Sequence, residues 1–161
     1  KSLDPSHGSL RKLCIDTSAL SSPMDVSLIQ TYGLRGLKSL TLHGSAIGGS
    51  FEVFMGLSGL QELDINNTKV DCSRALELIS LAPWAPQIKK LGLGDTNTQG
   101  DVAALGKCSN LVTANLFFCE KIIGDIAALE KCTNLLDIDF SSCKNLKGPF
   151  EVFMSLSALQ E

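Results

Sequence analysis

The sequence predicts a single α/β solenoid, with a curved parallel sheet on its concave side and short helices and 3₁₀ turns on its convex side. The first observation behind this prediction is a pattern, L-x-x-L-x-L-x-x-(S/T/C), that starts at residues 10, 37, 60, 88, 111 and 135. A period of 23 to 28 residues is typical of solenoids. The second observation is that apolar and polar residues alternate within each copy. The third is that the segments between the copies are themselves near-duplicates.

Each copy of the pattern supplies one expected strand. The fourth and sixth positions are apolar and the residues beside them are mostly polar, as in a short strand with one buried face. One such strand cannot bury its face alone, so the copies must stack into a parallel sheet over a continuous core. The six copies are Leu10-Leu13-Ile15-Ser18, Leu37-Leu40-Leu42-Ser45, Leu60-Leu63-Ile65-Thr68, Ile88-Leu91-Leu93-Thr96, Leu111-Ala114-Leu116-Cys119 and Leu135-Ile138-Phe140-Cys143.

The return segments between the strands are expected on the convex side. Residues 25–32 and 73–81 lie in the two longest repeats and have helical spacing of apolar residues, so we expect short helices there. Pro83 and Pro86 then end the second helix. The other return segments are expected to be 3₁₀ or irregular turns.

Duplication within the chain is visible in the return segments. Residues 100–108 and 124–132 are near-copies, and Phe-Glu-Val-Phe-Met occurs at 51–55 and again at 150–154. With these repeats, the chain resembles the leucine-rich repeat family from Leu10 to Glu161. Segments 100–108 and 124–132 are similar to the return segment of its plant-type subclass, without the proline.

The resemblance departs from the family at the ninth position of the pattern, where the family usually has Asn. Ser, Thr and Cys can serve a similar hydrogen-bonding role there, Cys more weakly. This column holds Ser18, Ser45, Thr68, Thr96, Cys119 and Cys143.

Length and composition indicate one domain over residues 1–161. The chain has 161 residues, 44% of them hydrophobic, and no Pro/Gly/Ser-rich linker. A seventh copy of the pattern begins at Leu159. Because solenoid ends normally carry polar capping repeats, we expect a fragment of a longer array, or part of a larger assembly that covers the open C-terminal end.

The charge pattern argues against several partner classes. Net charge is −3 and no Lys/Arg cluster exceeds a pair, so we expect no nucleic acid and no anionic membrane as partner. No apolar run approaches the roughly 18 residues that span a bilayer, so direct membrane insertion is not expected.

The six cysteines are interpreted as buried free thiols rather than as disulfides or a metal site. There is no C-x-x-C spacing, and only His7 and His43 could assist a zinc ion. Cys14 lies at an outward strand position and is expected to be the exposed thiol. Reduced cysteines favour an intracellular over a secreted location. The sequon Asn66-Asn67-Thr68 argues the other way.

The sequence predicts a protein that is not an enzyme and has no cofactor or metal. His7 is expected to be solvated. His43 could form an Asp16–His43–Asp64 line across adjacent strands, but the only nucleophile nearby is Cys14. The outward acidic residues are spread over several repeats with lysines between them, which favours a solvated mixed-charge face over a calcium site.

Outward positions of the concave strands are the predicted partner-binding residues. Phe117 and Phe118 stand out as adjacent aromatics among polar residues, beside a shallow hollow expected at Gly92 and Gly94. They could anchor a partner, or fold onto their own neighbours. The predicted set is Thr41, His43, Asp64, Asn66, Asn115, Phe117, Phe118 and Asp139. Trp84, on the convex side, is interpreted as a cap on the local core.

The resemblance implies a non-catalytic module that binds a protein or peptide on the concave face. Two alternatives remain open. One is a structural subunit or scaffold domain held permanently in a larger complex. The other is an extracellular receptor ectodomain, which would carry disulfides and glycans.

Overall fold

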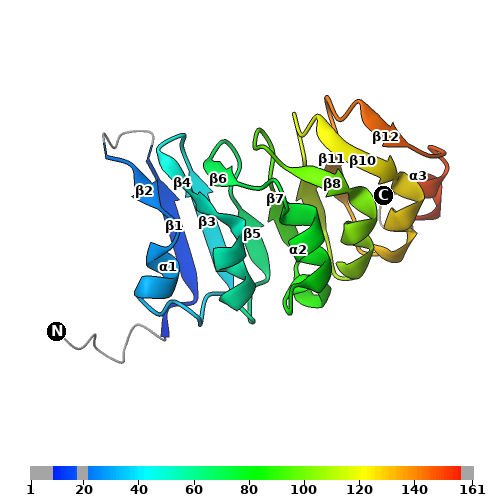
Figure 1. The fold of residues 1–161 in the computed structure, drawn as a ribbon. Helices are drawn as coiled ribbons and strands as arrows, with labels where there is room; N and C mark the ends of the chain where they lie inside the picture. Colours follow the sequence, from blue (N-terminus) through cyan, green and yellow to red (C-terminus); the bar gives the residue numbers. More distant parts are fainter. Residues whose placement is uncertain (1–8, 18–21, 157–161) are drawn as a thin grey trace.

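The computed structural model describes residues 9–17 and 22–156, without the side chain of Ser155. The expected seventh copy at Leu159, the residue His7 and the column position Ser18 lie outside this part. Figure 1 shows the repeats stacked side by side along one axis, from β1 at one end to α3 at the other. The predicted α/β solenoid is confirmed.

A six-stranded parallel sheet forms one side of the molecule, in the order β1-β3-β5-β7-β9-β11. Equivalent positions of successive repeats pair with each other, so that Cys14 pairs with Thr41 and Thr41 with Asp64. We call the outward face of this sheet the concave face. Its strands are β1 (Lys12–Asp16), β3 (Ser39–His43), β5 (Glu62–Asp64), β7 (Lys90–Gly92), β9 (Thr113–Asn115) and β11 (Asp137–Asp139).

Two smaller parallel sheets, which the sequence did not predict, begin the return segments. Each has three short strands. Five of the six strands end where a Gly or apolar residue precedes Asp or Ser, and β12 ends at Leu146-Lys147; their residues are too few to show a strand period in the sequence. The first sheet contains β2 (Met24–Asp25), β4 (Ile47–Ser50) and β6 (Lys69–Asp71), and the second contains β8 (Gln99–Asp101), β10 (Lys121–Asp125) and β12 (Asn145–Lys147).

Helices cover the side of the core opposite the large sheet (Figure 1). The helices predicted over 25–32 and 73–81 are present but begin later, because Asp25 lies in β2 and because Ser73 and Arg74 form a turn before α2. The final return segment is α-helical where a turn was expected. The helices are α1 (Leu28–Thr31), η2 (Phe51–Gly56), α2 (Ala75–Leu81), η3 (Ala85–Gln87), η4 (Val102–Lys107), η5 (Ile126–Lys131) and α3 (Val152–Ser155).

Aspartate side chains accept hydrogen bonds from the backbone at four of the strand-to-helix junctions. The side chains of Asp101 and Asp125 each accept a hydrogen bond of 2.8 Å from the backbone N–H two residues later, at the start of η4 and η5. These two bonds satisfy N–H groups that a helix start leaves unpaired. Asp25 and Asp71 accept in the same way from Ser27 N–H and Ser73 N–H, which fixes the turns before α1 and α2 without capping either helix.

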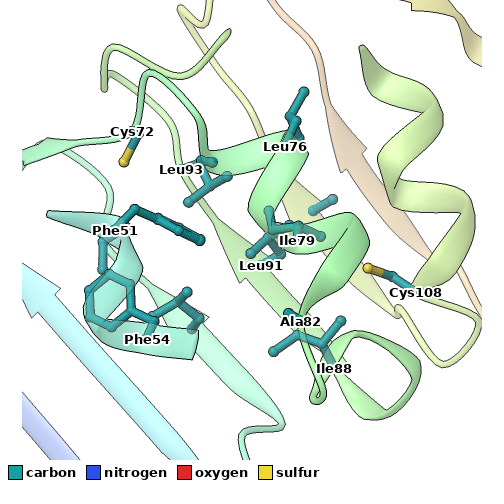
Figure 2. Close-up of a cluster of buried hydrophobic side chains, with 14 of the residues drawn as sticks. Phe51, Phe54, Cys72, Leu76, Ile79, Ala82, Ile88, Leu91, Leu93 and Cys108 are labelled. Carbon is teal, nitrogen blue, oxygen red and sulfur yellow. The ribbon is translucent and has the colours of Figure 1, made fainter. Parts of the chain in front are cut away.

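The core is one continuous apolar cluster between the large sheet and the helices (Figure 2). Trp84 is fully buried, and its Nε1 donates a hydrogen bond of 2.9 Å to the carbonyl of Phe54. This confirms its interpretation as a cap on the local core. The bond ties the turn after α2 to η2 of the preceding repeat.

Five of the six cysteines are buried and Cys14 is exposed, as predicted. All six carry free thiols in the structure. In the ninth column, Thr68 Oγ1 donates to the carbonyl of Ile65 at 2.8 Å. Cys119 Sγ and Cys143 Sγ donate to carbonyls of the preceding repeat, at 3.2 and 3.1 Å. The predicted hydrogen-bonding role is therefore kept at Thr68, Thr96, Cys119 and Cys143, whereas Ser45 is exposed.

Candidate functional site

The predicted binding residues lie in two columns of the concave face, one at the fifth and one at the seventh position of the pattern. Thr41, Asp64, Asn115 and Asp139 share the fifth column, as the strand register shows. His43, Asn66 and Phe117 share the seventh, and Phe118 follows at the eighth. The sheet therefore places the predicted residues along one face, although it spreads them over four repeats, with none in the fourth repeat.

Asp64 does not face solvent, contrary to the prediction. Only 5% of the surface of Asp64 is exposed to solvent. Lys90 of the next repeat reaches back over it, with 2.9 Å between Nζ and Oδ2. Charged residues are seldom buried unless paired, and here the lysine covers the carboxylate.

The hollow predicted at Gly92 and Gly94 is filled. A Cβ at Gly92 would lie 2.7 Å from Asp64 Oδ1 and 2.8 Å from Asn66 Nδ2. A Cβ at Gly94 would overlap Asn115 Oδ1. The two glycines thus make room for polar side chains of the neighbouring repeats, and both are buried.

Asn115 links this packing to the aromatic pair. Its Oδ1 accepts a hydrogen bond of 3.1 Å from the backbone N–H of Phe117. The missing side chain at Gly94 leaves the space that Asn115 occupies. Gly94 and Asn115 together therefore fix the turn that carries the two phenylalanines.

Phe117 and Phe118 are both exposed, at 38% and 48%. They lie in the turn directly after β9, with ring centroids 4.6 Å apart and planes at 75°. This edge-to-face contact is a favoured geometry for aromatic rings. The two rings pack on each other and leave an apolar surface open to solvent.

The backbone at Phe118 is unusual for a phenylalanine. Its φ is +59°, and the equivalent residues of the neighbouring repeats, Asn67, Asp95 and Ser142, have φ of +58°, +53° and +67°. Gly44 occupies the same column in the second repeat, with φ of +115°. Asn, Asp and Gly tolerate left-handed backbone, whereas a bulky side chain is strained there. The sequence contained this signal, because four of these five turn positions hold residues that favour turns.

A hollow of about 340 Å³ adjoins Phe118 on the edge of the sheet. It is lined by Thr96, Asn97, Thr98, Phe118, Glu120 and Lys121. The hollow and the two rings make up one surface, which we call the aromatic corner: Phe117, Phe118 and this lining. Its polar groups already bond within the domain, Asn97 to Cys72 N–H and to Asp71, and Thr96 to the carbonyl of Leu93, so the exposed rings are its open contact surface.

The catalytic line considered from the sequence does not form. Asp16 pairs with His43, but Asp64 pairs with Thr41, so the three side chains are not in one column. Among the described residues there is no cluster of three His, Cys, Asp or Glu side chains that could hold a metal ion. No helix in that part of the chain is long and apolar enough to cross a membrane.

Solved structures of other proteins share this fold, although the sequences differ. No protein-family profile and no curated protein sequence matches the chain. Among solved structures, it is similar to an internalin (inlF) of Listeria monocytogenes, with a TM-score of 0.60 and 17% identity over 94% of this chain. It is also similar to the LRR ectodomain of the receptor kinase SOBIR1 of Arabidopsis thaliana, with a TM-score of 0.61 and 20% identity over 85% of this chain. The chain has the leucine-rich repeat fold.

A third similar structure is the plant peptide hormone receptor RGFR1 in complex with RGF2. The TM-score is 0.54, with 17% identity over 80% of this chain. The chain spans 46% of the length of the internalin, 71% of the SOBIR1 ectodomain and 20% of RGFR1. At these identities the similarity defines the fold alone, and the leucine-rich repeat surface of this chain has to be interpreted from its own residues.

Proposed function

We propose that this leucine-rich repeat domain is a non-catalytic interaction module that binds a protein or peptide on its concave face. The observation that carries the proposal is the aromatic corner. A strained, half-exposed Phe118 beside an exposed Phe117 costs stability and fills no core space. Aromatic residues, Phe among them, are enriched at the cores of protein interfaces, and strained residues cluster at functional sites.

The flanking concave residues would complete the contact. Thr41, His43, Asn66 and Asn115 are partly exposed and carry donors and acceptors along the sheet. Their side chains extend the surface from the aromatic corner toward the first repeat. Asp64 is no longer part of the proposed contact, because Lys90 covers it.

A photo-crosslinking experiment tests the proposal directly. p-Benzoylphenylalanine replaces Phe117 in one variant and the exposed convex residue Leu81 in a matched control. Both are irradiated in lysate of the source organism and the adducts are identified by mass spectrometry. We expect a discrete protein adduct from position 117 and none from position 81. The same adducts from both positions, or from position 81 alone, would contradict concave binding.

A second candidate function, a structural subunit in a larger assembly, is favoured by the surface around α3. The duplicated segment Phe-Glu-Val-Phe-Met places Phe51 in the core at 0% exposure, whereas Phe150 is 73% exposed. Leu136 and Met154 are exposed beside it, around a hollow lined also by Phe140 and Phe153. Sedimentation velocity of the wild type against Phe150→Glu/Met154→Glu tests this candidate. Association that the variant abolishes supports it, and a wild type that stays monomeric at all concentrations contradicts it.

A further inference from the structure

The charge of the concave face differs between its two ends. At the starts of the strands in the first, second and fourth repeats, the exposed residues are basic: Arg11, Lys12, Lys38, Lys89 and Lys90. In the fifth and sixth repeats, Val112 and Leu136 occupy the column of Arg11, Lys38 and Lys89. Around the aromatic corner lie the carboxylates of Asp95, Glu120 and Asp139 together with Lys121 and Lys144, and because Lys144 pairs with Glu120, the two aspartates outnumber the remaining lysine where the proposed contact lies.

Two carboxylates lie on either side of the aromatic pair. Asp95 occupies the position of Phe118 in the preceding repeat, and its backbone N–H donates to the carbonyl of Phe117 at 2.7 Å. Asp139 lies on β11 in the following repeat, where its carbonyl accepts from the N–H of Leu116 at 2.8 Å. Both aspartates are thus in strands or turns hydrogen-bonded to the segment that carries Phe117 and Phe118.

These carboxylates are not neutralised within the described part of the chain. None of the ion pairs there uses Asp95, Asp137 or Asp139, and Lys144 already pairs with Glu120 at 2.8 Å. The N–H of Ser141 donates to Asp139 Oδ1 at 2.8 Å. Hydrogen bonding from the Ser141 side chain, together with this backbone bond, lowers the pKa of Asp139, which therefore carries its charge at neutral pH.

We propose that the aromatic corner binds an extended segment of a partner protein in which an apolar side chain is flanked by Lys or Arg. This inference rests on the proposed function and names the chemistry of its partner. The apolar side chain lies against Phe117 and Phe118, and the cations face Asp95 and Asp139. A Lys or Arg beside the exposed rings also gains a cation–π contact.

Strand geometry sets the spacing of such a segment. Asp95 and Asp139 belong to repeats four and six, two strand spacings or about 10 Å apart, and they lie at the eighth and fifth positions of the pattern, about another 10 Å apart along the strands. The diagonal distance between the two residues is therefore about 14 Å, and an extended chain advances about 3.3 Å per residue. A segment running diagonally across the strands would bracket its apolar residue with cations about four residues apart.

Selection from a random 12-residue peptide library displayed on phage tests the inference. The bait is the wild-type chain, and the selection is repeated on Phe117→Ser/Phe118→Asn and on Asp95→Asn/Asp139→Asn. These asparagines occur naturally at the same positions of other repeats, as Asn67 and Asn115, so the fold is retained; circular dichroism checks it. Enriched peptides are then titrated by fluorescence anisotropy at low and high salt.

We expect wild type to enrich peptides with an apolar residue between Lys or Arg residues. Their affinity should fall about tenfold or more for Asp95→Asn/Asp139→Asn and at high salt. Enrichment of neutral or acidic peptides that depends on the phenylalanines but not on the aspartates would overturn this inference and leave the proposed function standing. Enrichment that is unchanged by Phe117→Ser/Phe118→Asn, or none on any bait, would contradict both.

Discussion

At the scale of single residues, the most informative position is Phe118. Its backbone is shared with Asn67, Asp95 and Ser142, but its side chain is not suited to that backbone. Neighbouring repeats thus provide an internal reference for the residue that folding alone would favour there. The difference between that residue and phenylalanine is the physical basis for assigning Phe118 a role in binding.

Replacing Phe118 by Asn should leave the free energy of unfolding unchanged within about 0.5 kcal/mol, or raise it. Relief of left-handed strain offsets the loss of the ring contact with Phe117. Urea unfolding followed by circular dichroism measures this, with Phe54→Ala as a core control expected to cost about 3–5 kcal/mol. A loss above 2 kcal/mol for Phe118→Asn would mean that the ring serves folding.

Gly94→Ala tests how the aromatic pair is held in place. The added Cβ overlaps Asn115 Oδ1, so Asn115 must leave the N–H of Phe117 and the turn must shift. We expect weaker binding of the peptides selected on wild type, by about tenfold, with a loss of stability of about 1 kcal/mol or less, the size of one hydrogen bond. Unchanged affinity would show that Asn115 does not position Phe117.

At the scale of elements, the return segments are held to one another as firmly as to the sheet. Each strand of the large sheet is short, and three of its residues at most pair in repeats three to six. Rigidity therefore depends on the packing of η2, α2, η4 and η5 beneath it and on bonds such as that from Trp84 to Phe54. A firm sheet is what allows its exposed turns to act as a preorganised surface.

Trp84→Phe should lower the free energy of unfolding by about 1–3 kcal/mol. The change keeps most of the apolar volume but removes the indole donor, so the carbonyl of Phe54 retains only the bond from the N–H of Leu57 at 3.1 Å, and part of the indole volume is left empty. Urea unfolding measures the loss, and Trp84→Ala should cost more because it leaves a larger cavity. If Trp84→Phe unfolds at the wild-type urea concentration, the hydrogen bond does not contribute to coupling η2 and the turn after α2.

At the scale of the whole molecule, the features that follow from the repeat period were predicted correctly. The predictions were wrong where side chains of different repeats contact one another. The strands, the buried cysteines and the core position of Trp84 follow from spacing and composition. The exposure of Asp64 and the hollow at Gly92 and Gly94 were predicted wrongly. Each depends on side chains of an adjacent repeat. Lys90 covers Asp64. The side chains of Asp64, Asn66 and Asn115 fill the space beside the two glycines. The predicted contribution of the remaining concave residues to binding stays a prediction.

The buried thiols make the stability of the whole domain sensitive to alkaline pH. Burial raises the pKa of Cys72 and Cys108 to about 12, from an ordinary value of 9.0. The stability that these thiols contribute is complete below pH 9 and is lost as pH rises toward 12, at about 1.4 kcal/mol per pH unit for each thiol. Urea unfolding with reductant measures the free energy of unfolding at pH 8 and at pH 10.5. Its decrease between the two pH values should be about 2 kcal/mol smaller for Cys108→Ala than for wild type. Equal losses would contradict this.

We propose that Phe118 serves binding although its left-handed backbone lowers the stability of the fold. The most direct test titrates the partner captured through position 117 against wild type and Phe118→Asn, with unfolding midpoints measured on the same samples. We expect Phe118→Asn to bind the partner at least about tenfold more weakly than wild type, equivalent to about 1.4 kcal/mol. Its unfolding midpoint should equal or exceed that of wild type. Equal affinities of the two proteins for that partner would contradict the claim.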